Sequence, residues 1–191
     1  MNTERHDRDK GERPISLNSS EKIPLDRPQA EENIEITVKS GVIRIAANQS
    51  KKAEDITLAF ICRADIFKFH YPGNLELSIE AMTDTTYIVE TVNKIDPHTS
   101  DSIIDWIIQL HIVRNETNLE KRLMKFFRLL TTKLGKRTSE GLVLEQTLPH
   151  ARIAEIVGST RSTVSRTIST LRKNQQIYID ELKGQMILPV D

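Results

Sequence analysis

The side chains best suited to chemistry in this chain are the arginines and hydroxyls of residues 148–171, which read LPHARIAEIVGSTRSTVSRTISTL. No Asp or Glu occurs from residue 156 through residue 179. Four cations fall within that stretch, namely Arg161, Arg166, Arg172 and Lys173. Because guanidinium and ammonium groups on an acid-free surface gain free energy by neutralising phosphates, the segment predicts a surface that binds double-stranded DNA.

The same inventory of reactive side chains argues against an enzyme. The chain has no Gly-rich phosphate loop, no HExxH and no GxSxG sequence. Its five histidines are scattered without the spacing of metal ligands: His6, His70, His98, His111 and His150. The single cysteine, Cys62, excludes a disulfide framework or a cysteine-ligated zinc or iron–sulfur site within one chain. We therefore expect no catalytic activity, no cofactor and no metal.

Two short helices joined at Gly158 would position the basic residues. The first helix begins near Pro149, which a first helical turn tolerates because its missing N–H would be unpaired anyway. Gly158 lies at the turn, where a positive φ is needed. The second helix has a buried face spaced i, i+4, i+7, formed by Val164, Ile168 and Leu171.

The opposite face of the second helix is polar. At 100° per residue it contains Ser162, Arg166, Ser169 and Lys173, flanked by Arg161 and Ser165 on one side and Thr163 on the other. That layout is typical of a recognition helix, whose early residues reach base edges in the major groove while hydroxyls and other cations hold phosphates.

One long helix over residues 99–136 is predicted before this unit. Ser102 with Asp105 fits a capping box, although Asp101 or Ser100 could equally be the N-cap. The helix is apolar nearly all round through residue 113, then amphipathic as far as Gly135, which is placed to end it. We expect it to pack against a sheet and against a second subunit, with a central helix in a monomer as the alternative. The expected dimer contacts are Ile104, Ile108, Leu119 and Leu123.

The remaining segments complete an α+β protein. Residues 1–33 are mostly polar and predict a disordered N-terminal segment. Short β-branched runs over residues 34–98 predict a shortened antiparallel β-roll. In residues 137–191 the two helices are followed by two apolar runs around Lys183-Gly184, which predict a hairpin and hence a C-terminal winged helix-turn-helix domain.

Charge is divided unevenly along the chain although its formal net charge is zero. Residues 1–120 carry 14 Lys and Arg against 21 Asp and Glu, whereas residues 121–191 carry 13 against 6. Such asymmetry favours one end that faces nucleic acid and another end with a different role. No secretory signal or membrane span is visible in the sequence, so we expect a cytoplasmic, nucleoid-associated protein or one in the plastid stroma.

The two-helix unit also resembles a known protein family. The sequence IAEIVGSTRSTVSRTISTLRKNQQI resembles the helix-turn-helix of the Crp/Fnr superfamily, and its GSTR-x-TV-x-R core looks most like the cyanobacterial and plastid NtcA-type regulators. The resemblance is specific over about residues 119–191, loose over 34–118 and absent over 1–33. It implies a β-roll, a dimerisation helix and a winged helix, and a homodimer that binds pseudo-palindromic DNA and contacts RNA polymerase, with activation favoured over repression.

The resemblance also implies roles for individual residues. Arg161, Ser162 and Arg166 align with the family's base-reading positions, and Arg161 and Arg166 are the leading candidates for reading guanine. At Ser162 catabolite activators carry Glu and the NtcA type carries Val, which implies a different half-site. Phosphate contacts are expected from His150, Thr160, Thr163, Ser165 and Lys173.

The resemblance predicts an effector domain, but its usual contacts are missing from the sequence. No Arg occurs between Arg63 and Arg114, where cyclic-nucleotide-binding members carry a phosphate-binding Arg, so we expect no cyclic-nucleotide binding. Arg114 alone remains as a candidate for the 2-oxoglutarate contacts of NtcA-type proteins. Two rival hypotheses stay open: a degenerate member that acts as a protein-interaction module with weak DNA binding, and a switch that senses an unidentified metabolite.

Overall fold

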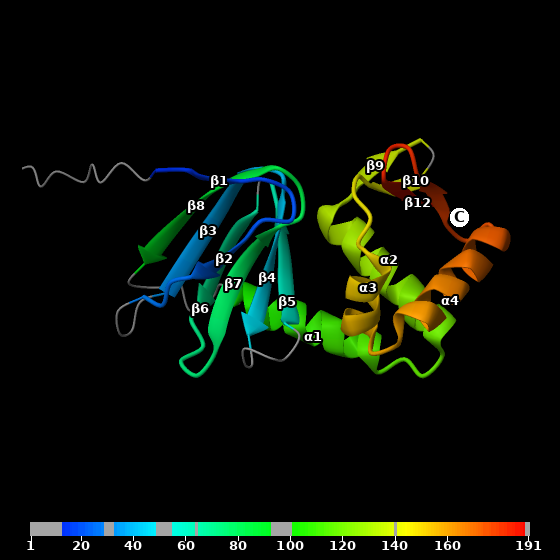
Figure 1. Cartoon of the computed structure of the whole chain (residues 1–191), viewed down its shortest axis with the longest axis horizontal. Helices are drawn as coiled ribbons and strands as arrows, with labels where there is room; N and C mark the ends of the chain where they lie inside the picture. The colour runs from blue at the N-terminus through cyan, green and yellow to red at the C-terminus, as the bar shows by residue number, and fades with distance from the viewer. Residues whose placement is uncertain are drawn as a thin grey trace, which may run out of the picture.

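The structure, a computed structural model, describes residues 13–28, 33–48, 55–63, 65–92, 101–139 and 141–189. A β-sheet part and a helical part lie side by side, with one helix running from the sheets to the helical part (Figure 1). The α+β class predicted from the sequence is confirmed.

The β-sheet part is a jelly roll of two four-stranded antiparallel sheets. Its strands are β1 (Ile15–Leu17), β2 (Lys22–Leu25), β3 (Asn33–Ser40), β4 (Val42–Asn48), β5 (Ile56–Cys62), β6 (Ile66–His70), β7 (Glu76–Ala81) and β8 (Thr85–Val92). One sheet has the order β1-β8-β3-β6 and the other the order β2-β7-β4-β5. The described residues thus form eight roll strands, two of which precede the start at residue 34 expected from the sequence.

Two expectations fail at the N-terminal edge of the roll. A disordered segment over residues 1–33 and a first strand at residue 34 are expected from the sequence, but β1 and β2 already pair with β8 and β7. Residues 1–12 and 29–32 lie outside the described residues. Each short strand inserts one apolar side chain into the core, Leu17 from β1 and Leu25 from β2. Pro24 fits within β2 because β2 is the edge strand of its sheet, where a missing N–H leaves no ladder bond unmade.

The predicted single helix over residues 99–136 is two helices, α1 (Ser102–Arg114) and α2 (Leu119–Leu134). Asp101 is the N-cap of α1, and its carboxylate accepts from the backbone N–H groups of the second and third helical residues. The break arises from the NETN sequence between the helices. Asn115 ends α1, and the side chain of Asn118 caps α2 by accepting from the N–H of Lys121 at 3.0 Å.

The C-terminal part contains α3 (His150–Val157), α4 (Arg161–Lys173) and a small sheet. That sheet has the order β11-β12-β10-β9 and is formed by β9 (Lys136–Thr138), β10 (Gly141–Leu144), β11 (Tyr178–Asp180) and β12 (Gln185–Leu188). The hairpin of β11 and β12 confirms the predicted wing, and Gly184 adopts φ 63° in its turn. The sequence interpretation missed β9 and β10, and the boundary it placed at residue 137 is not a structural break because α2 packs against α3, α4 and β10.

A single hydrophobic cluster runs from the roll through α1 and α2 into the C-terminal part. α1 covers β5 and β6 and also contacts α2 and α3. Its buried face consists of Ile103, Trp106, Leu110 and Val113. Among the helices of the described residues, none is long and apolar enough to cross a membrane.

Candidate nucleic-acid interface

α3 and α4 form a compact pair joined by a three-residue turn. Gly158 ends α3 in the left-handed region at φ 66° and ψ 56°, which confirms the sequence prediction for this turn. Arg122 of α2 reinforces the turn by donating to the carbonyl oxygen of Val157 at 2.9 Å. α4 buries Val164, Ile168 and Leu171 completely or nearly so, as the i, i+4, i+7 spacing predicted. Its opposite face is on the side of the molecule away from the roll (Figure 1).

The cations on the exposed face of α4 are not neutralised by neighbouring side chains. Arg161 and Arg166 are exposed, and neither makes an ion pair with any residue in the described part of the chain. Lys173 in the last turn is likewise exposed, whereas Arg172 pairs with Glu181 of the wing at 2.9 Å. No acidic residue lies in the first turn of α4, so Arg161 adds to the positive end of the helix dipole.

Several hydroxyls on α4 are engaged within the helix. Thr167, Ser169 and Thr170 each donate to the carbonyl oxygen four residues earlier, at 2.9, 3.0 and 3.2 Å. A hydroxyl proton used in this way is not available to a phosphate oxygen, which can only accept. The unpaired guanidinium groups are therefore the principal donors that this face offers to nucleic acid.

The residues expected to contact phosphates divide into two groups. Thr160 is the N-cap of α4 and accepts from the N–H of Thr163 at 3.2 Å, so it shapes the helix start. His150 and Ser165 are half-buried and hydrogen-bond to each other at 2.7 Å across the α3–α4 packing. Thr163 and Lys173 remain exposed beside the arginines. The Thr163 hydroxyl also lies 2.8 Å from that of Thr160. The structure thus brings the predicted base-reading residues together on one face and gives four of the five phosphate candidates local hydrogen-bond partners.

Residues 121–189 match the model of the Crp-like helix-turn-helix domain. The chain is 34% identical over 73 residues to the global nitrogen regulator of Nostoc sp. and 33% identical over 73 residues to that of Synechococcus elongatus. Each match covers 38% of this chain and 33% of the relative, so the similarity spans about a third of the nitrogen regulators' length.

Solved structures extend the similarity to the whole fold. FixK2 from Bradyrhizobium japonicum superposes with a TM-score of 0.68 at 17% identity, over 93% of this chain and 92% of that one. A CRP/FNR-family transcriptional regulator from Thermus thermophilus superposes with a TM-score of 0.63 at 20% identity, over 94% of each chain. Residues 121–189 are therefore a Crp-like helix-turn-helix domain, and the chain as a whole shares the fold of these regulators. The match to the Crp-like domain confirms the resemblance seen in the sequence of α3 and α4.

The Crp-like domain is joined to the roll by a group of charged side chains that the sequence interpretation missed. Arg44 of β4 is fully buried on the side of its sheet that faces α3. Its guanidinium lies 2.5 Å from the Glu80 carboxylate of β7 and 3.6 Å from that of Glu155 on α3. Its Nε donates to Thr57 Oγ1 at 2.8 Å. Burial, followed by repulsion from Arg152, lowers the pKa of Arg44.

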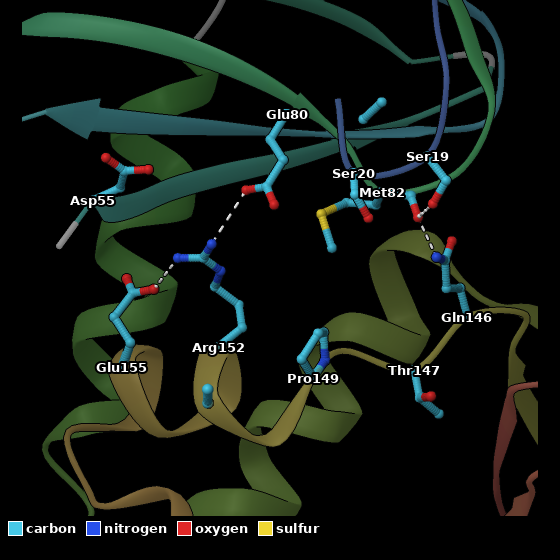
Figure 2. Close-up of a pocket in the computed structure, with 12 residues that line it drawn as sticks. Ser19, Ser20, Asp55, Glu80, Met82, Gln146, Thr147, Pro149, Arg152 and Glu155 are labelled. Carbon is cyan, nitrogen blue, oxygen red and sulfur yellow. Dashed lines mark hydrogen bonds and ion pairs between the residues drawn. The ribbon is translucent and has the colours of Figure 1, made fainter. Parts of the chain in front are cut away.

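Arg152 completes this arrangement from the α3 side. It pairs with Glu155 at 2.7 Å and reaches back to Glu80 of the roll at 3.4 Å, as Figure 2 shows. We call Arg44, Glu80, Arg152 and Glu155 the roll–α3 ion cluster. The Glu155 carboxylate also accepts from the backbone N–H of Thr57 at 3.0 Å, which ties α3 directly to β5.

Sequence patterns gave little signal for the roll–α3 ion cluster. Arg44 occurs in the strand pattern GVIRIA, where alternation predicts only an outward-facing side chain. Whether an outward face meets solvent or another domain depends on tertiary packing. The i, i+3 spacing of Arg152 and Glu155 was visible, but such pairs are common on exposed helices.

The residues expected at the dimer contact lie in different environments. Ile104 and Ile108 are 55% and 49% exposed on α1, and Ile107 and Ile112 extend the same stripe. Leu123, in contrast, is fully buried in this chain's own core, so its predicted contact with a second subunit is corrected. Leu119 is half-buried against the same core. The break between α1 and α2 explains the change, because α2 no longer continues the direction of α1 and instead packs against α3, α4 and β10.

Proposed function

We propose that this protein is a sequence-specific DNA-binding regulator of transcription that binds a pseudo-palindromic site as a homodimer. The observation that carries the proposal is the exposed, acid-free face of α4, on which Arg161 and Arg166 have no carboxylate partner among the described residues. Phosphates and guanine acceptors of DNA can supply partners for these guanidinium groups, and a helix of this kind fits the major groove.

Within this proposal Arg161 and Arg166 read bases, and Ser162 adjusts the half-site between them. An arginine can donate two parallel hydrogen bonds to guanine O6 and N7, and each such contact contributes about 1–3 kcal/mol of base discrimination. Thr163 and Lys173 contact phosphates directly. His150, Thr160 and Ser165 support the helix pair from within and add phosphate contacts only where their local hydrogen bonds rearrange.

The exposed isoleucine stripe of α1 supports the homodimer. At 100° per residue, Ile104, Ile107, Ile108 and Ile112 fall on one side of α1, opposite the face buried against the roll. Four exposed isoleucines on one helix are a large apolar surface for a monomer, and pairing of two α1 helices would cover it. Such a dimer would place two α4 helices in successive major grooves about 34 Å apart.

The roll supports the expectation that no cyclic nucleotide is bound. Among the described strands of the roll, Arg44 is the one arginine. The Glu80 and Glu155 carboxylates of the roll–α3 ion cluster already neutralise its charge. A buried phosphate elsewhere in these strands would lack an arginine partner. By family analogy the bound regulator contacts RNA polymerase, which is an inference from relatedness rather than from a site.

The rival proposal is a protein-interaction module whose basic face binds nucleic acid without sequence preference. Fluorescence anisotropy separates the two when sites from a random-oligonucleotide selection are compared with scrambled DNA at rising salt. A sequence-specific regulator retains its preference when phosphate attraction is screened, whereas a generic basic surface loses nearly all binding.

Arg166→Ala and Arg172→Ala form a matched pair for this assay, because both side chains are exposed on α4 but Arg172 already pairs with Glu181. We expect Arg166→Ala to relax preference at one base pair per half-site by about 10- to 100-fold. Arg172→Ala should weaken all sequences slightly and equally. Equal losses from both variants on every sequence would reject the base-reading role and favour the rival.

A further inference from the structure

A cavity of about 510 Å³ lies where the end of the roll meets α2 and the segment leading into α3. Its walls are largely apolar and come from both parts of the molecule. Val42 and Phe60 contribute from the roll, and Leu130, Leu134 and Leu144 contribute from the other side. The volume is within the range of about 300–1,000 Å³ that small-molecule sites occupy.

The charged residues around this cavity are predominantly basic. Arg63, Lys133 and Lys136 line it together with one carboxylate, Glu145. Lys136 pairs with Glu145 at 2.7 Å, so these two charges offset each other. Arg63 and Lys133 are exposed, and neither side chain makes an ion pair with another described residue. An apolar wall with two unpaired cations beside it is complementary to a molecule that has an apolar body and one negative end.

Cys62 is a partly buried residue of the same cavity. Its thiol lines the cavity, and burial, assisted by the neighbouring Asp65, raises its pKa to about 11. A thiolate is disfavoured there because the surroundings solvate charge poorly. Arg63 and Lys133 are exposed to water at this cavity, whereas the Cys62 thiol is partly buried and lies 3.3 Å from the Asp65 carboxylate.

We propose that this cavity binds a small amphipathic monocarboxylate, with its alkyl or aryl body against Phe60 and Leu134 and its carboxylate between Arg63 and Lys133. The site lies apart from α4 and does not depend on the proposed DNA contacts. Because both the roll and the Crp-like domain supply its walls, occupancy stabilises one relative placement of the two. By linkage, a bound carboxylate and bound DNA would affect each other's affinity.

Decanoate is a suitable probe, and the single tryptophan of the chain supplies a signal. Trp106 contacts Phe60 edge-on, with ring centroids 5.8 Å apart, so a ligand seated against Phe60 should alter its emission. We expect a saturable change with decanoate on the full-length protein and weaker binding of decanol and decyltrimethylammonium. Equal affinity for all three would overturn the carboxylate assignment, and a signal that does not saturate would overturn the site.

Lys133→Gln tests the position of the carboxylate, and Lys121→Gln is the matched control on an exposed part of α2 outside the cavity. We expect Lys133→Gln to weaken decanoate by about three- to tenfold and to leave decanol unchanged, since a partly exposed charge contact contributes modestly. Identical decanoate affinity in both variants would refute the arrangement. Thermal unfolding of each variant shows that the fold is intact.

Alkylation of Cys62 provides a second, local readout on the unmodified chain. Decanoate should slow the reaction of Cys62 with iodoacetamide in proportion to the saturation that Trp106 reports. A fluorescence change without protection of Cys62 would place the ligand elsewhere near α1 and reject this cavity.

Discussion

Replacing Arg44 with methionine removes the positive charge at the centre of the roll–α3 ion cluster while retaining much of the apolar stem. The side chain is 0% exposed, and its partners Glu80 and Glu155 are 18% and 15% exposed. Removing one partner of a buried ion pair costs about 3–5 kcal/mol because the other charge stays behind uncompensated. Arg152 still pairs with both carboxylates, which puts the expected loss near the lower limit, at about 3 kcal/mol.

The matched control is Arg172→Met. Arg172 lies 2.9 Å from the Glu181 carboxylate, which is between the 2.5 Å and 3.6 Å that separate Arg44 from Glu80 and Glu155. The Arg172 and Glu181 side chains, however, are 44% and 74% exposed. Exposed pairs contribute about 0–1 kcal/mol, so burial and not distance should decide the ranking. In a chain of 191 residues, a loss of about 3 kcal/mol lowers the midpoint of thermal unfolding by roughly 6–12 °C.

Urea unfolding followed by Trp106 emission measures both variants, and a double-mutant cycle isolates the link between the roll and α3. Arg44→Met combined with Glu155→Gln should show a coupling of about 1–2 kcal/mol, because the two side chains share one network. Equal losses for Arg44→Met and Arg172→Met would refute the reasoning from burial. A large loss with no coupling to Glu155 would show that Arg44 stabilises the roll alone.

Three further expectations follow from the structure. Ile108→Glu should convert a micromolar dimer into a monomer in sedimentation, whereas Ile66→Glu, which changes an isoleucine that is 63% exposed on the roll, should not; a monomeric parent protein would contradict the dimer itself. Gly158→Ala should lower the free energy of unfolding by about 1–2 kcal/mol, because φ is 66° and a new Cβ would lie 3.0 Å from Arg114 Nη2. An unchanged urea midpoint would contradict this expectation. At pH 8 Cys62 should react with iodoacetamide on the order of 100-fold more slowly in the folded chain than after unfolding, since its pKa rises from 9.0 to about 11; equal rates would refute the desolvation.

Local patterns predicted the Crp-like domain well. The spacing of Val164, Ile168 and Leu171 defined the buried face of α4, and Gly158 marked the turn because a positive φ is costly for other residues. The wing hairpin followed from Gly184 between two apolar runs. These features depend on interactions between residues close in sequence, which periodicity reports directly.

Other features were misjudged because local patterns underdetermine them. A continuous apolar and amphipathic stretch suggested one helix, but Asn115 and Asn118 provide caps that divide it. β1 and β2 are too short to show a clear period, and only pairing with β8 and β7 fixes them as strands. Leu123 had the spacing of an interface residue, yet it is buried within this chain's own core.

The sequence by itself determined the helix Arg161–Lys173, its acid-free face and the separation of charge between the two ends of the chain. These are properties of residue type and of a 3.6-residue period, so no tertiary contact is needed to see them. Only the tertiary structure decided that Arg44 meets Glu155 and Arg152, that α1 leaves Ile104 and Ile108 exposed, and that a cavity opens beside Lys133. Each of these features arises where segments far apart in the chain pack together. The free energy of burying a side chain there depends on contacts with distant residues, which the local sequence pattern does not reveal.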